Sequence, residues 1–119
     1  MPNEPRNAMS SDQLLAHWQG HRRLTRRVIE AFPEDKLFTH SIGGMRPFGA
    51  MALEIITMGP PMIRGAVNGD WSTTWDRSAK PKAEILAMWD KATKDIDELW
   101  KQLPAGRFDE TIKAFGQYE

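Results

Sequence analysis

Two histidines and one glutamate are the side chains whose types and spacing could bind a metal ion. His17 and His21 lie four residues apart, which places two imidazoles on one face of a helix. Glu54 lies three residues after Met51 and four before Met58, within an apolar stretch where an unpaired carboxylate is costly. On adjacent helices the three would form a two-histidine, one-carboxylate set for a divalent ion, which could be zinc, nickel or manganese.

Each of these residues also has a structural interpretation. A two-histidine spacing is common on helices, so His21 could be a boundary residue and His17 a surface residue. Glu54 could be a metal ligand, a general base, or a half-buried carboxylate paired with an arginine or histidine of a neighbouring helix. We assign no catalytic residue and no cofactor-binding residue from the sequence.

The elements that would position these side chains are three helices. Ser10 and Gln13 fit a capping box, so the first helix should start there and end near Phe32, before a proline. The second should start near Pro47 and run toward Val67, with a kink or an interruption at Gly59-Pro60-Pro61. The third should start around residues 79–81 and end at Leu103.

Apolar residues repeat at helical spacing in all three segments and predict which faces pack together. In the first helix the predicted stripe is Leu14, Trp18, His21, Thr25, Val28 and Phe32. In the second it is Phe48, Met51, Ile55, Met58 and Met62. In the third it is Ile85, Trp89, Ala92, Ile96, Leu99 and Leu103. The three stripes predict an all-α helical bundle.

Charge and composition limit the partners. Sixteen basic and sixteen acidic residues cancel, and the chain has no cysteine. Arg22, Arg23, Arg26 and Arg27 would form a basic patch on the outer side of the first helix, but without net charge or interleaved aromatics we expect no nucleic-acid binding. No signal-like or membrane-length apolar run occurs, so we expect no membrane partner and a cytoplasmic, soluble domain.

Several segments resemble the DinB-like (DinB/YfiT) superfamily of helical bundles. The second helix of that family is similar to FGAMALEI (48–55), Gly59-Pro60-Pro61 and MIRGAVNGDW (62–71). Uncharacterised members are similar to AKPKAEILAMWDKATKDIDELWKQLP (79–104) and FDETIKAFGQYE (108–119). The resemblance covers about residues 10–119, a C-terminally incomplete bundle domain, and we expect residues 1–9 to be a disordered arm.

The resemblance implies an up-down-down-up bundle, often a homodimer, with one metal-binding histidine from helix two and an H-x-x-x-H pair from helix four. Glu54 stands at the position of that first histidine. We expect three main helices, with the fourth absent or supplied by a partner.

The resemblance also implies a divalent-metal-binding protein with metal-dependent hydrolase or thiol-transferase ancestry. Without the usual ligands we expect no catalytic competence in this chain, and the substrate stays open. The alternative is a non-catalytic structural, assembly or stress-associated helical module without metal. We expect a homodimer in either case.

Overall fold

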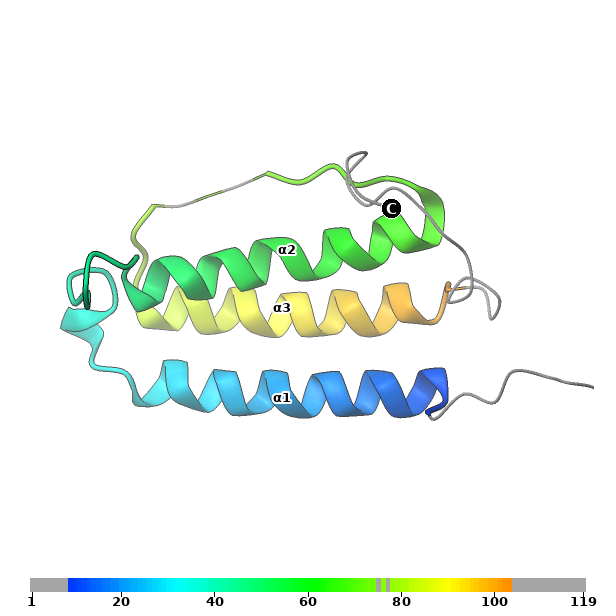
Figure 1. The fold of residues 1–119 in the computed structure, drawn as a ribbon, viewed down its shortest axis with the longest axis horizontal. Helices are drawn as coiled ribbons and strands as arrows, with labels where there is room; N and C mark the ends of the chain where they lie inside the picture. Colours follow the sequence, from blue (N-terminus) through cyan, green and yellow to red (C-terminus); the bar gives the residue numbers. More distant parts are fainter. Residues whose placement is uncertain (1–8, 75, 77, 104–119) are drawn as a thin grey trace, which may run out of the picture.

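Three long helices and one short helical turn make up the part of the chain that the structure describes (Figure 1). The computed structural model describes residues 9–74, 76 and 78–103. Its elements are α1 (Ser11–Ala31), the 3₁₀ turn η1 (Glu34–Lys36), α2 (Phe48–Asn68) and α3 (Lys82–Trp100). These residues include no β-strand, so the all-α class is confirmed for the part of the chain described.

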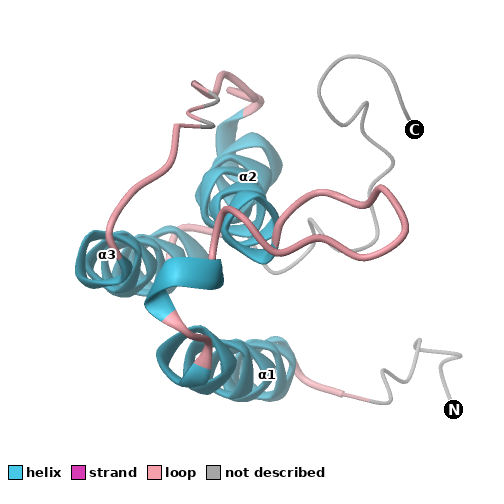
Figure 2. Ribbon diagram, turned by 90° about the vertical axis from the view of Figure 1, so that its left-hand side faces the viewer, coloured by secondary structure: helices cyan, strands magenta, loops and turns pink. Residues whose placement is uncertain are grey.

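The helices lie side by side along one long axis. In Figure 1, α1 runs in one direction, and α2 and α3 run parallel to each other in the opposite direction. The segment between α2 and α3 therefore crosses back along the length of the bundle. Figure 2 shows the three helices end-on at the corners of a triangle. No described helix is long and apolar enough to cross a membrane.

The predicted helix ends agree closely with the structure. The Ser10 hydroxyl accepts from the backbone N–H of Gln13 at 3.1 Å, and the Gln13 side chain accepts from the Ser10 N–H at 2.8 Å. This reciprocal pair is the predicted capping box. Helix α2 follows Pro47 directly and ends at Gly69, whose φ of 80° lies in the left-handed region.

Helix α2 runs without interruption through Pro60 and Pro61, so the predicted interruption is wrong. Pro61 cannot donate a hydrogen bond to the carbonyl of Thr57, four residues earlier. The Thr73 hydroxyl lies 3.3 Å from that carbonyl and donates to it instead. A side chain of the crossover segment thus replaces a donor that the proline removes.

Helix α3 is the central element, because it packs against both α1 and α2. Its predicted stripe is confirmed over most of its length. The buried residues of α3 are Ile85, Trp89, Ala92, Ile96 and Trp100. Fully buried partners of this core include Ile29 from α1, Leu37 after η1, and Leu53 from α2.

The predicted stripe of α2 is wrong by one residue. The buried residues are Gly49, Ala52, Leu53, Ile56, Gly59, Pro61, Ile63 and Gly65. Ile55 and Met62 are instead 44% and 42% exposed. Nearly every side of α2 is apolar, so periodicity alone does not choose between neighbouring stripes. The small residues of α2 determine which of its faces is buried. At Gly49, for example, a Cβ would lie 2.7 Å from the Phe38 ring, so only a glycine allows this close contact.

The predicted stripe of α1 is shifted in the same way. Its buried residues are Gln19, Arg22 and Ile29, whereas Leu14 and Val28 are 40% and 49% exposed. The expectation that four arginines form an outer basic patch is therefore wrong for Arg22, which is 3% exposed. It is also wrong for Arg26, which forms an ion pair with α3.

Two further predictions concern residues that the structure describes only in part. The expected arm at residues 1–9 lies outside the described residues except for Met9, and residues 104–119 of the predicted bundle domain also lie outside them. Trp71, in the segment after α2, folds back onto that helix, since a Cβ on Gly65 would lie 2.1 Å from its ring.

Candidate functional site

Glu54 lies half-buried on α2 and is already paired. The Nη1 of Arg46, just before the helix, donates to the Glu54 carboxylate. The side chains of Glu54 and Arg46 are 31% and 60% exposed, so this is an ion pair at the surface. The pair agrees with the structural interpretation of Glu54, except that the arginine comes from the segment before α2 and not from a neighbouring helix. The metal-ligand and general-base interpretations of Glu54 stay predictions.

His17 and His21 are adjacent, as their spacing predicts. Their ring centres lie 4.7 Å apart with the ring planes at 74°, and both side chains are exposed. Across residues 9–74, 76 and 78–103, no three His, Asp or Glu side chains gather into a group that could hold a metal ion. The predicted set of His17, His21 and Glu54 is thus not assembled. Metal binding by the histidine pair alone stays a prediction.

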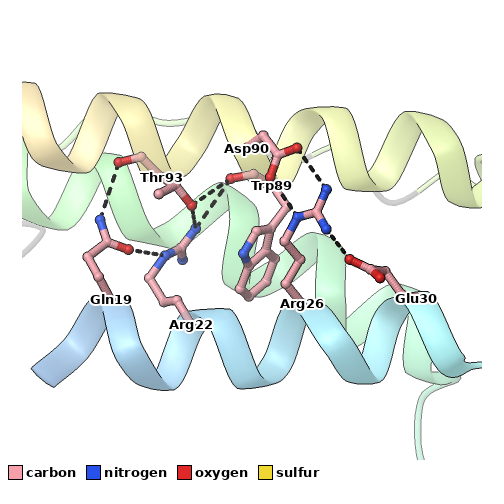
Figure 3. A network of polar contacts seen from close by, with 7 residues as sticks. All are labelled: Gln19, Arg22, Arg26, Glu30, Trp89, Asp90 and Thr93. Carbon is pink, nitrogen blue, oxygen red and sulfur yellow. Dashed lines mark hydrogen bonds and ion pairs between the residues drawn. The ribbon is translucent and has the colours of Figure 1, made fainter. Parts of the chain in front are cut away.

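A buried polar network between α1 and α3 was missed by the sequence analysis (Figure 3). Arg22 donates from Nε to the Gln19 side-chain oxygen and from Nη2 to the Thr93 hydroxyl, both at 3.1 Å. The Gln19 side-chain amide donates to Asp97 at 3.1 Å. Burial lowers the pKa of Arg22, and the charge of Asp97 opposes that shift.

One donor of this guanidinium has no hydrogen-bond partner in the described part of the chain. It is Nη1 of Arg22, which lies 3.7 Å from the position of a Cβ built on Gly59 of α2. The absence of a side chain at Gly59 leaves room for this close approach. Arg22 of α1 therefore bonds to α3 and lies beside Gly59 of α2.

A second, more exposed network joins the same two helices (Figure 3). Arg26 donates from Nε and Nη2 to the two carboxylate oxygens of Asp90 at 2.7 and 2.9 Å, and it also pairs with Glu30. The hydrogen bond from Arg26 lowers the pKa of Asp90, and the same bond raises the pKa of Arg26. This geometry is a two-point clamp between α1 and α3.

The exposed apolar members of the two predicted stripes of α1 and α2 form a surface turned away from α3. Trp18 of the α1 stripe does not, because its ring centre lies 6.4 Å from that of Trp100 in α3. One residue along a helix turns the side chain by about 100°. Both stripes precede the buried ones by one residue, and α1 and α2 run in opposite directions (Figure 1). The exposed stripe residues therefore turn toward the same side of the bundle. Phe32 and Phe48 stack there, with ring centres 4.6 Å apart. We call the surface formed by these two stripes the α1–α2 face.

A pocket of about 280 Å³ opens at one end of this face. Phe32, Phe48 and Met51 line its inner side, and residues of the segment 40–46 line the rest. The pocket thus joins the end of α1 to the beginning of α2.

Comparisons with known proteins give no family assignment: no protein-family model matches the chain, and no curated protein matches it. The DinB-like resemblance therefore stays a hypothesis.

Proposed function

We propose that this chain is a non-catalytic helical assembly module that pairs with a second copy of itself through the α1–α2 face. The observation that carries the proposal is the exposure of large apolar side chains at regular spacing on two neighbouring helices. Val28 is 49% exposed, Ile55 44% and Met62 42%. Contiguous apolar surface of this kind is typical of interaction sites.

The sequence of the face supports a second copy as the partner. None of the positions in the two stripes is Asp, Glu, Lys or Arg. A copy related by a two-fold axis presents the same pair of antiparallel helices, so two identical apolar faces cover each other. Four antiparallel helices around a shared apolar core form a common stable bundle.

Charge placed in the face tests this proposal. We expect Ile55→Glu and Met62→Glu to shift the chain from dimer to monomer in light scattering, because each buries a carboxylate at the interface. Ala87→Glu is the matched control, since Ala87 is exposed on α3 outside the face. Monomeric wild-type protein, or dimers unaffected by both substitutions, would contradict the proposal.

Metal binding by His17 and His21 is a second candidate function, favoured by the 4.7 Å separation of their exposed rings. It agrees with the metal-binding ancestry that the DinB-like resemblance implies, although fold analogy is a weak reason for any chemistry. Zinc or nickel titration should show one site that is lost in His17→Ala and kept in His40→Ala. Equal affinity in wild type and His17→Ala would end this candidate.

A further inference from the structure

The pocket at the end of the α1–α2 face is lined mainly by apolar side chains. The stacked rings of Phe32 and Phe48 form its base together with Met51, and Ile42 and Met45 lie at its mouth. Ile42 and Met45 are 70% and 61% exposed. Large apolar side chains at the mouth of an apolar pocket favour an apolar ligand that extends outward from it.

The mouth is held by a tight turn. The backbone N–H of Met45 donates to the carbonyl of Ile42 at 3.1 Å, and the two glycines between them have φ of 60° and 76°. The Ser41 hydroxyl also donates to the Met45 carbonyl. These bonds define the backbone turn that places Ile42 and Met45 beside the pocket.

Two nitrogen-bearing side chains, Arg46 and His40, complete the lining. Arg46 gives Nη1 to Glu54, whereas its Nε and Nη2 have no hydrogen-bond partner within the described residues. A guanidinium with two free N–H groups can bind a carboxylate through both oxygens. The pocket therefore combines an apolar interior with an anion-binding group at its edge.

We propose that this pocket binds a small monocarboxylate with an unbranched apolar chain, such as a medium-chain fatty acid. The chain would lie against the phenylalanine pair and the methionines, and the carboxylate would accept hydrogen bonds from Arg46. A volume near 280 Å³ is just below the usual range for ligand pockets, so the ligand has on the order of ten non-hydrogen atoms. Octanoate has this size.

Calorimetric titration with three probes of equal chain length tests the charge preference. At neutral pH we expect octanoate to bind about tenfold or more tightly than octylammonium or 1-octanol, because only the carboxylate pairs with Arg46. Octylammonium binding as tightly as octanoate, or no detectable octanoate binding, would overturn the proposal.

Two substitutions locate the site. Arg46→Gln should weaken octanoate binding about tenfold and leave 1-octanol binding unchanged, since it removes only the charged contact. Ile42→Asp should weaken both probes, because it places a carboxylate at the mouth. Arg64→Gln is the matched control, because Arg64 pairs with Asp70 away from the pocket. Unchanged octanoate affinity in Arg46→Gln would contradict the assignment.

Phe32, Phe48 and Met51 belong both to the pocket and to the α1–α2 face, so the titration is repeated on the Ile55→Glu variant, in which the face is not covered by a second copy. Octanoate binding by a wild-type chain that is monomeric would reject only the dimer. Absence of octanoate binding in both the wild type and a monomeric Ile55→Glu variant would reject only the ligand site. Unchanged helical circular dichroism in each variant excludes unfolding as the cause of lost binding.

Discussion

The guanidinium carbon of Arg22 lies 4.3 Å from the centre of the Trp89 ring, inside the interface between α1 and α3. Trp89 is 1% exposed and Arg22 3%, so a cation lies on an indole face in the core of the bundle. Such a contact is strongest when it is removed from water. Three of the hydrogen bonds of this guanidinium, to Gln19, Thr93 and the Trp89 carbonyl, offset part of the cost of burying its charge.

Substitutions at Arg22 should separate packing from charge. We expect Arg22→Ala to lower the free energy of unfolding by about 2–4 kcal/mol, because it leaves a cavity and removes the donor to Gln19. Arg22→Met keeps most of the volume and relieves the desolvation, so we expect a change of less than about 1 kcal/mol. Urea unfolding measures both. Equal losses in the two variants would show that the charge, and not the packing, is what matters.

The clamp between Arg26 and Asp90 should make stability depend on pH. The pKa of Asp90 is lower in the folded chain than in the unfolded one. Its contribution is therefore complete above the unfolded value of about 4 and is lost as the pH falls through the folded value. We expect Asp90→Asn to cost roughly 0.5–1 kcal/mol at neutral pH, since the pair is partly exposed, and the difference from wild type to shrink in acid.

The pKa of Asp90 can be followed directly by NMR. In Arg26→Gln we expect it to rise toward the ordinary aspartate value, because the hydrogen bond that lowers it is gone. Asp90 titrating identically with and without Arg26 would rule out the clamp.

The same substitution at two glycines should have opposite effects. Gly69 has a φ of 80° with open space around its Cα, so Gly69→Ala should cost about 1 kcal/mol through backbone strain alone. Gly20 lies within α1, and its nearest contact for a Cβ is Arg23 at 3.6 Å. Gly20→Ala should therefore stabilise the chain by about 0.5–1 kcal/mol. Thermal unfolding measures both changes in stability. Two variants that are both stabilised, or both destabilised, would contradict the different roles given to the two glycines.

The helices and their ends could be predicted because their signals are local. The Ser10–Gln13 box and Pro47 act within one turn of a helix start, and both stand where the helices were expected to begin. The stripe of α3 was also predictable, since Ile85 and Trp89 are large apolar residues with charged neighbours. Local patterns are sufficient when only one face of a helix is apolar.

The packed faces of α1 and α2 could not be predicted in the same way. On α1 the core-facing position is Arg22, which periodicity assigns to the surface, and its partner Thr93 lies 71 residues further along the chain. On α2 the buried face is the one where other residues approach Gly49 and Gly59 closely. Glycines carry no hydrophobic signal, so the apolar pattern does not reveal this face. The sequence did contain one signal for this interface. Asp90, Thr93 and Asp97 recur at helical spacing on α3, which indicates that polar side chains of another helix face them.

The most direct measurement is the molar mass of the intact chain in solution, by sedimentation equilibrium at micromolar to submillimolar concentration. We expect twice the 13.6 kDa of a single chain, because the α1–α2 face leaves Val28, Ile55 and Met62 exposed in one copy and buries them in two. A mass of 13.6 kDa at every concentration would contradict the proposed assembly.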